Sequence, residues 1–386
     1  METVDLPLSG ILVLDFSQFL AGPVAALRLA DLGATVIKIE RPLVGDIGRK
    51  LAFAGKYIAG ESVSFHSMNR NKFGITADLK NTDDLQKIKL LIRKADVIIQ
   101  NFRPGVMERI GLDYETVKGL NPELIYASVS GYGSEGPWKD RPGQDLLAQS
   151  ISGLPWLSGS KSSGPIPVGL SIADHLTSCH LAQGITALLV RRSRTGLGGL
   201  IETSLLESML DLQFELLSAR LNDPSISVRH KGQYSANAFL SAPYGIYPTA
   251  NGYISIAMNP VDKLGEILDI PELVQLKLEQ EWWDHQETIE ALLAAKFSSN
   301  PTEHWLKILD LEDIWCAPLL TLDELVDHEG FRAIDMVQTV HRDETPIFTT
   351  RSPIRIDGKK LVSGKGAPRL GQDTKLVTKL LEEDGE

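Results

Sequence analysis

Cysteine is scarce in this sequence, and no long hydrophobic run is present. The 386-residue chain has two cysteines, Cys179 and Cys316, which are too few for the disulfide framework of a small secreted domain. No run approaches the ~18 apolar residues that cross a bilayer, and residues 1–10 lack the cationic and apolar regions of a signal peptide. We therefore expect a protein of the reducing cytoplasm with no membrane partner.

An excess of positive charge is also missing. The chain has 39 lysines and arginines against 50 acidic residues, which gives a formal net charge of −11. That charge repels nucleic acid and anionic lipid, so we expect no nucleic-acid partner, and an anionic ligand needs a local cluster of cations. With 43% hydrophobic and 23% charged residues, the composition is typical of an ordinary folded protein that needs no metal or disulfide for folding.

The first two hundred residues alternate between strand and helix patterns. Short apolar, β-branched runs predict strands, and apolar residues at helical spacing predict helices. The strands are predicted at 11–16, 35–40, 96–100 and 124–130, and the helices near 23–33, 85–94, 114–120 and 175–192. This alternation predicts an α/β fold, with a Rossmann-like parallel sheet in a large domain over residues 1–203.

The rest of the chain has a different pattern. Residues 204–232 predict a linker whose first part, 204–222, is one long helix. Two strand patterns at 244–249 and 253–258, followed by helical patterns, predict a smaller α+β domain over 233–324. Residues 325–386 predict a strand pair and a terminal helix that return to complete the large domain.

Polar and aromatic residues follow two of the predicted strands. Parallel sheets bind ligands outside the carboxyl ends of their strands. Residues 101–105 (NFRPG), which lead to Arg109, offer backbone donors, an aromatic ring and two guanidiniums, and Arg41 follows the strand at 35–40. A single arginine is usually a solvated surface charge, but arginines on adjacent strand-end loops of an acidic protein favour an anion site.

Asp174 stands before the apolar helix predicted at 175–192 and has two interpretations. Its carboxylate can cap the free amides of that helix, which general physical chemistry favours. Alternatively, it is a nucleophile towards an activated acyl group, with an ordinary pKa near 4.

Several familiar sites are absent or incomplete. The sequence has no H-E-x-x-H, paired C-x-x-C, Walker A or G-x-S-x-G motif, and His175 and His180 lie off the three- or four-residue spacing that puts two metal ligands on one helix face. A G-x-G-x-x-G pattern at 131–136 follows a predicted strand but does not open a helix, which disfavours a nicotinamide cofactor.

The order of motifs resembles the family III coenzyme A-transferases over nearly the whole chain. The motifs include LDFSQFLAGP, TVIKIERP, NFRPGVMERIGLDY, SGYGSEGP, GLSIAD and APRLG. This family includes formyl-CoA and carnitine-CoA transferases and is related to the α-methylacyl-CoA racemases. The resemblance implies a CoA-binding Rossmann-like domain, a smaller domain, and two chains interlocked as a homodimer.

The resemblance also implies a reaction and its residues. CoA passes from an acyl-CoA to a free carboxylic acid through an aspartyl anhydride and an aspartyl-CoA thioester on Asp174. The CoA thioester is then a substrate, and no tightly bound cofactor and no metal are expected. The implied CoA contacts are Arg41 at the adenine, Arg109 at the phosphates, Asn101 and Phe102 along the pantetheine arm, and Arg103 as an auxiliary cation.

Two departures from related sequences bear on the reaction. The racemases need a histidine where this sequence has Gln144, and glutamine cannot exchange a proton near neutral pH, so racemisation is the less favoured alternative. Gln144 is instead one of several candidate donors to a tetrahedral oxyanion, together with the Gln18 side chain and backbone amides of the first strand-end loop or of residues 233–238. Leu20 replaces a glutamine of formyl-CoA transferase, and residues 234–244 lack its tetraglycine flap, which argues against formyl-CoA or oxalate. A non-catalytic CoA-binding protein is the third alternative.

Overall fold

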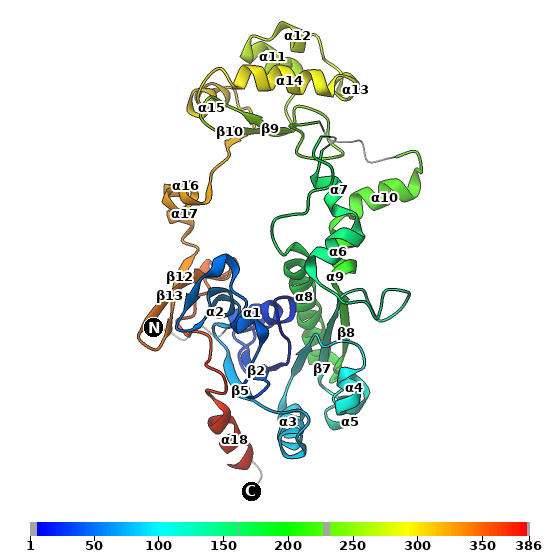
Figure 1. Cartoon of the computed structure of the whole chain (residues 1–386), viewed down its shortest axis with the longest axis vertical. Coiled ribbons are helices and arrows are strands. Elements are labelled where there is room, and N and C mark those ends of the chain that lie inside the picture. Colours follow the sequence, from blue (N-terminus) through cyan, green and yellow to red (C-terminus); the bar gives the residue numbers. More distant parts are fainter. Residues whose placement is uncertain (1–5, 161, 227–231, 384–386) are drawn as a thin grey trace. The chain divides into compact units, whose positions relative to one another are not determined.

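The chain forms two compact units. The computed structural model describes residues 6–160, 162–226 and 232–383 (Figure 1). Unit 1 comprises 1–148, 171–211 and 335–386, and unit 2 comprises 149–170 and 212–334. Each unit is therefore built from segments that are distant in sequence.

Unit 1 is built on a six-stranded parallel sheet. The strands are β1 (Leu12–Asp15), β2 (Thr35–Glu40), β5 (Phe73–Thr76), β6 (Val97–Gln100), β7 (Ile125–Ser130) and β8 (Gly199–Ser204). They pair in the order β5-β2-β1-β6-β7-β8, and every pair is parallel. This is the doubly wound order whose direction reverses between β1 and β6. The predicted Rossmann-like α/β fold is confirmed.

Local signals in the sequence explain where the helices of unit 1 begin and end. Asn81 caps α3 by accepting hydrogen bonds from two amides, and Asp113 caps α5 by accepting the amide and the hydroxyl of Thr116. Gly196, with φ of 69°, ends α8. The helices are α1 (Ala21–Asp31), α2 (Val63–Asn69), α3 (Thr82–Lys94), α4 (Val106–Ile110), α5 (Tyr114–Leu120), α8 (Ile172–Thr195), α9 (Leu205–Leu212) and α18 (Thr374–Glu383), and α6 (Asp145–Ser152) starts in this unit.

The core of unit 1 lies on both faces of the central strands. All four residues of β6 are buried, as expected for a strand covered by helices on both sides. Leu14 and Ile98 pack against Ile92 of α3 and Val117 of α5 in one cluster. Each fully buried aliphatic side chain of this kind stabilises the fold by roughly 1.5–3 kcal/mol.

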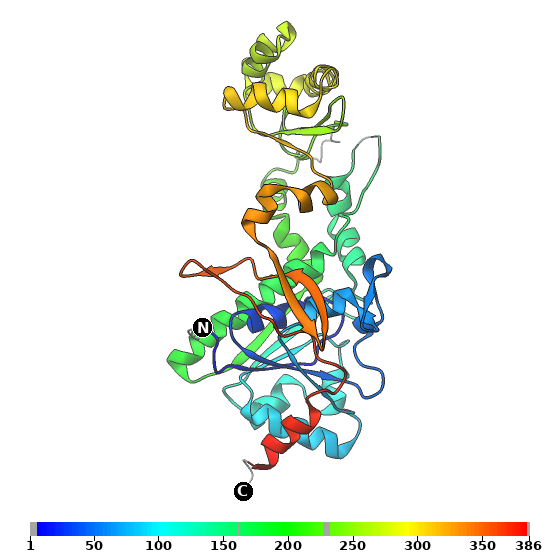
Figure 2. The same cartoon turned by 90° about the vertical axis from the view of Figure 1, so that its left-hand side faces the viewer.

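The carboxyl-terminal segment belongs to unit 1. It contains a hairpin, β12 (Val337–Arg342) and β13 (Thr345–Thr350), a short pair, β14 (Arg355–Ile356) and β15 (Lys359–Lys360), and α18. Figure 2 shows this segment in orange and red beside the large sheet. The Gly74 amide of β5 donates to Asp373 Oδ2 at 2.8 Å, and the Asp373 amide donates to the Gly74 carbonyl at 2.8 Å. The segment therefore covers the β5 edge of the sheet.

Unit 2 is a smaller α+β body. Its antiparallel sheet has the order β11-β10-β9, with β9 (Gly245–Pro248), β10 (Tyr253–Ile256) and β11 (Cys316–Pro318), so the predicted hairpin is present. Phe297 and Trp305 meet edge to face at 5.5 Å in its core. Its helices are α7 (Leu154–Ser158), α10 (Phe214–Asn222), α11 (Val261–Leu268), α12 (Pro271–Val274), α13 (Glu279–Asp284), α14 (Gln286–Phe297), α15 (Thr302–Leu311), α16 (Leu322–Asp327) and α17 (Glu329–Ile334).

The structure departs from the predicted elements in several places, and two of them concern how the chain packs. The helix predicted over 204–222 is interrupted, because Gln213 adopts φ −103° and ψ 19° between α9 and α10. Strand β5 was not predicted, because it is short and contains Gly74. A Cβ at that glycine would lie 2.7 Å from Cβ of Pro368, so the glycine is needed for close packing of the returning chain. Among the described residues, we find no helix with the length and apolar character needed to span a bilayer.

Candidate active site

The loops after β1 and β6 meet at the point where the strand order reverses. The side chain of Asn101 lies between them: its Oδ1 accepts the Gln18 amide at 2.9 Å, and its Nδ2 donates to the Gln18 carbonyl at 2.7 Å. Crevices of this kind bind ligands in doubly wound sheets. The predicted site residue Asn101 therefore braces the first strand-end loop.

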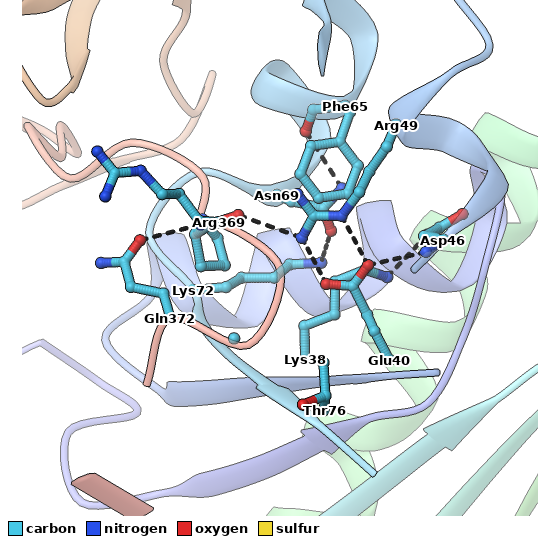
Figure 3. Close-up of polar contacts among 12 residues, drawn as sticks. Lys38, Glu40, Asp46, Arg49, Phe65, Asn69, Lys72, Thr76, Arg369 and Gln372 are labelled. Atoms are coloured by element: carbon cyan, nitrogen blue, oxygen red, sulfur yellow. Dashed lines mark hydrogen bonds and ion pairs between the residues drawn. The ribbon is translucent and has the colours of Figure 1, made fainter. Parts of the chain in front are cut away.

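A network of buried charges lies beneath the same loop. Lys38 of β2 is fully buried, and its Nζ lies 2.9 Å from Asp46 Oδ2 and 2.9 Å from the Ser17 carbonyl oxygen. Glu40 Oε1 accepts the Asp46 amide at 2.8 Å and Arg49 Nε at 2.9 Å (Figure 3). Sequence analysis missed this network, although lysine in the middle of an otherwise apolar strand was a visible signal.

The three predicted arginines have free guanidiniums. Arg41 follows β2, Arg103 follows β6 and Arg109 lies in α4, and all three are exposed. Within the described parts of the chain, no hydrogen bond or ion pair engages their guanidiniums. Gly105, with φ of 79°, leaves room for Arg109, whose Nη1 would lie 3.1 Å from a Cβ at that position. These cations are available to an external anion.

A cavity of about 460 Å³ opens at the carboxyl ends of β6, β7 and β8. Phe102 and Arg103 line it, together with Ser128, Lys139 and Glu202. Phe102 also packs against the main apolar cluster of unit 1, which fixes its ring. The cavity brings together two of the predicted site residues. Its lining does not include Arg41, Asn101, Arg109, Gln144 or Asp174.

Asp174 is the third residue of α8, and the predicted capping role for its carboxylate is wrong. The helix begins at Ile172, and its N-cap residue is Ser171. The Asp174 backbone amide itself needs a partner, and it donates to Asp145 Oδ2 at 3.1 Å. The cap therefore comes from a carboxylate twenty-nine residues earlier.

The environment of Asp174 changes its acidity. Burial raises the pKa of Asp174 to about 7, and the nearby Asp145 carboxylate adds to this shift by repulsion. The expectation of an ordinary pKa near 4 is therefore wrong. Around neutral pH, small changes in proton concentration alter the charge of this carboxyl group.

The first residue of α6 and the residue before it differ in their surroundings. Gln144 is exposed, and its carbonyl oxygen accepts the Ala148 amide at 3.0 Å. The next residue, Asp145, is buried and contacts Asp174, although sequence analysis gave weight only to Gln144. An acidic residue at the start of a helix was the only signal for it, and that signal is common.

Two histidines of α8, His175 and His180, lie near Asp174 in the sequence and differ in their surroundings. Burial lowers the pKa of His175, and the charge of Arg28 lowers it further, so this imidazole is neutral near pH 7. His180 contacts Ser208 Oγ at 3.0 Å and Asp211 Oδ2 at 3.2 Å. In the described part of the chain, no group of three histidine, cysteine, aspartate or glutamate side chains is arranged to hold a metal ion.

Known proteins resemble the chain over almost its whole length. Succinyl-CoA:glutarate CoA-transferase of Mus musculus is 29% identical over 380 residues, which cover 97% of this chain and 86% of the relative. Acetyl-CoA:oxalate CoA-transferase of Acetobacter aceti is 32% identical over 378 residues, which cover 95% and 93%. The crystal structure of a CAIB/BAIF family protein from Brucella suis superposes with a TM-score of 0.86 at 29% identity, covering 97% of this chain and 99% of the other.

A sequence model of an enzyme family agrees with these similarities. The model described as CoA-transferase family III matches residues 8–374. The family model and the named relatives support the same assignment, a CoA-transferase, over the racemase and the non-catalytic CoA-binding protein. The chain belongs to CoA-transferase family III and is an enzyme that transfers CoA between an acyl-CoA and a carboxylic acid.

Proposed function

We propose that Asp174 is the covalent nucleophile of this CoA-transferase. The observation that carries the proposal is a half-buried carboxyl group whose pKa is raised to about 7 by burial and by Asp145. A carboxylate solvated by bulk water is a weak nucleophile. Partial desolvation makes the oxygen of Asp174 more basic and more reactive towards an acyl carbonyl.

The reaction proceeds through four acyl-transfer steps. An Asp174 carboxylate oxygen attacks the donor thioester, CoA thiolate leaves, and a mixed anhydride forms. The thiolate attacks the aspartyl carbonyl, which expels the donor acid and leaves an aspartyl-CoA thioester. The acceptor carboxylate attacks that thioester and releases the thiolate again. The thiolate then attacks the acceptor acyl carbonyl of the new anhydride and restores Asp174, with no net use of water or protons.

Other residues serve CoA binding and charge stabilisation. The free guanidiniums of Arg41 and Arg109 bind the adenine end and the phosphates, because a chain with a net charge of −11 needs local cations for a polyanion. The buried face of Phe102 supports the pantetheine arm, with Arg103 as an auxiliary cation and Asn101 ordering the loop beside it. The exposed amide of Gln144 donates to the oxyanion of a tetrahedral intermediate.

The substrates are short dicarboxylic acids and their mono-CoA thioesters. The names of the two relatives mention succinyl-CoA, glutarate, acetyl-CoA and oxalate, and every corresponding acid except acetate has a second carboxylate. Leu20 and the missing tetraglycine flap argue against oxalate, so we favour the longer succinate and glutarate. We further propose a homodimer, which light scattering on the purified chain would test.

Mass spectrometry tests the nucleophile. The enzyme is mixed with succinyl-CoA without acceptor, and the intact protein is weighed after rapid quenching. We expect an adduct that hydroxylamine removes, and a digest that locates it on Asp174. Deuterium exchange at the α-carbon without acceptor would instead identify a racemase.

Two variants complete this test. Asp174→Asn should form no adduct and lose transfer by at least about a thousandfold, as expected when a covalent nucleophile is removed. Asp262→Asn changes an aspartate in the first turn of α11 and should keep full activity. Near-native turnover of Asp174→Asn would contradict the proposal.

A further inference from the structure

We propose that Lys38 and Asp46 are positioning residues, which hold the backbone of the loop after β1 in the conformation that binds acyl-CoA. The inference rests on the proposed function, because it assigns that loop to the CoA site. Neither side chain needs to touch substrate. Their effect passes through the peptide groups of residues 17–19, which lie where the strand order of the sheet reverses.

The position of Lys38 explains why its charge is buried. Residues alternate between the two faces of a strand, and its neighbours Ile37 and Ile39 enter the apolar cluster on one face. Lys38 therefore points to the opposite face, where its side chain is fully buried. Burial favours the neutral amine, but Asp46, Asp15 and Glu40 outweigh that effect and raise the pKa of Lys38. Lys38 is a fixed cation beneath the loop.

The ion pair reaches both ends of the short loop. Lys38 Nζ donates to the Ser17 carbonyl oxygen at 2.9 Å, and Asp46 Oδ1 accepts the Phe19 amide at 3.3 Å. Between them, both backbone groups of Gln18 bond Asn101. Three consecutive residues of the loop are thus held by side chains from three other segments.

This bracing has a conformational purpose. Phe19 has φ of 64°, a left-handed conformation that costs a non-glycine residue about 1 kcal/mol or more. Such a conformation persists only where surrounding contacts enforce it. The Phe19 side chain is 52% exposed, so its own packing does not supply all of that restraint. The hydrogen bond from its backbone amide to Asp46 adds to that restraint.

The same network extends to the loop that carries Arg41. Glu40 accepts the Asp46 amide and also pairs with Arg49 (Figure 3). Arg49 Nη2 donates to the Pro368 carbonyl oxygen at 3.2 Å, which links the network to the carboxyl-terminal segment. Substitutions at Lys38 or Asp46 should therefore change the conformations of the loops after β1 and β2, both of which we assign to the CoA site.

A second buried ion pair in unit 1 provides a matched control. Arg70 bonds both carboxylate oxygens of Asp31, and both side chains are almost fully buried. Neither residue bonds a strand-end loop of the candidate site. Loss of this pair should lower the stability of the fold without changing the affinity for CoA. A variant of this pair therefore shows whether lower stability alone weakens CoA binding.

The experiment compares Lys38→Met and Asp46→Asn with Arg70→Met in the full-length protein. Calorimetric titration with CoA itself measures Kd, and initial rates with succinyl-CoA measure KM and kcat. We expect Kd and the KM for acyl-CoA to rise at least about tenfold in both positioning variants. The KM for the acceptor acid should change less than about twofold, and kcat at saturation should fall less than Kd rises. Arg70→Met should lower Tm with Kd unchanged.

The outcomes separate this inference from the proposed function. Absence of an Asp174 adduct in the wild-type enzyme would refute the proposed nucleophile, whereas CoA binding is measured independently of it. If Lys38→Met and Asp46→Asn fold and bind CoA with the wild-type Kd, the positioning role is overturned. It is also overturned if Arg70→Met loses as much affinity for CoA as these two variants do. If Lys38→Met fails to fold, Asp46→Asn decides, because it keeps the Oδ1 acceptor and replaces the Oδ2 that pairs with Lys38 by an uncharged amide nitrogen.

Discussion

At the scale of single residues, Asp174 meets two opposing requirements. It must be ionised to attack a thioester, yet burial and Asp145 favour its protonated form. The raised pKa of about 7 makes the ionised oxygen more basic, and it keeps part of the molecules protonated near neutral pH. The reactivity of the carboxylate and its abundance are therefore set by the same two neighbours.

Asp145→Asn should shift the pH dependence of adduct formation. In the wild-type enzyme we expect the rate to rise with pH and to reach half its maximum near pH 7. Asparagine removes the repulsion and keeps an oxygen for the Asp174 amide, so the midpoint should move to lower pH. It should stay above 4, because burial, the larger cause, remains. Quench-flow mass spectrometry from pH 5 to 9 measures the midpoint, and an unchanged midpoint would contradict this account.

Asp174→Asn should stabilise the protein in alkaline solution. The pKa of Asp174 is higher in the folded protein than in the unfolded chain, so the folded state binds more protons between about pH 4 and 7. The stability contribution of this carboxyl therefore falls as pH rises through that window. We expect a gain of about 1–2 kcal/mol at pH 8, after allowance for partial exposure, and a smaller one at pH 5. Thermal unfolding at both pH values measures it, and an equal gain at both would contradict the linkage.

At the scale of elements, the first turn of α1 packs directly against the loop after β1. A Cβ at Gly22 would lie 2.3 Å from Cβ of Ser17, closer than any real contact. The glycine therefore allows the helix to begin immediately beside the loop. This close approach joins the start of α1 to the backbone that Lys38 and Asp46 hold.

Gly22→Ala should displace this loop. Overpacking of this kind typically costs about 1–3 kcal/mol, and here the displaced group is Ser17, so affinity for CoA should also fall. Gly119→Ala in α5 is the control, because its Cβ would meet no atom within 4 Å, and it should be neutral or stabilising by about 0.5–1 kcal/mol. Urea unfolding and CoA titration measure both effects. Wild-type CoA affinity in Gly22→Ala would exclude the predicted displacement.

At the scale of the whole molecule, unit 1 is completed by a segment from the far end of the chain. Residues 335–386 belong to the same unit as the first strand. They bond the edge strand β5 through Asp373 and contact Arg49 through Pro368. Residues from the two ends of the chain therefore lie side by side in unit 1.

Asp373→Ala should loosen this closure. It removes the acceptor of the Gly74 amide, and loss of such a partly buried bond costs about 1–2 kcal/mol. Asp343→Ala removes an exposed ion pair with Arg369 and should cost less than about 1 kcal/mol. Unfolding free energies and hydrogen exchange at Gly74 test the difference. Equal losses in the two variants would argue against an edge closed by Asp373.

The sequence by itself determined the features that depend on local pattern. Alternating strand and helix periodicity specified the parallel sheet, because the side-chain spacing of each element is written in a few consecutive residues. Cap residues such as Asn81, Asp113 and Gly196 set some element boundaries. The ordered motifs pointed to the enzyme family and to Asp174 as a candidate nucleophile.

Only the tertiary structure decided features that depend on distant neighbours. The acidity of Asp174 follows from burial and from Asp145, which α6 brings to the start of α8. The pairing of Lys38 with Asp46 beneath the first loop and the covering of β5 by the returning chain have the same origin. Desolvation and charge pairing depend on what surrounds a group in space, and consecutive residues in the sequence do not record those surroundings.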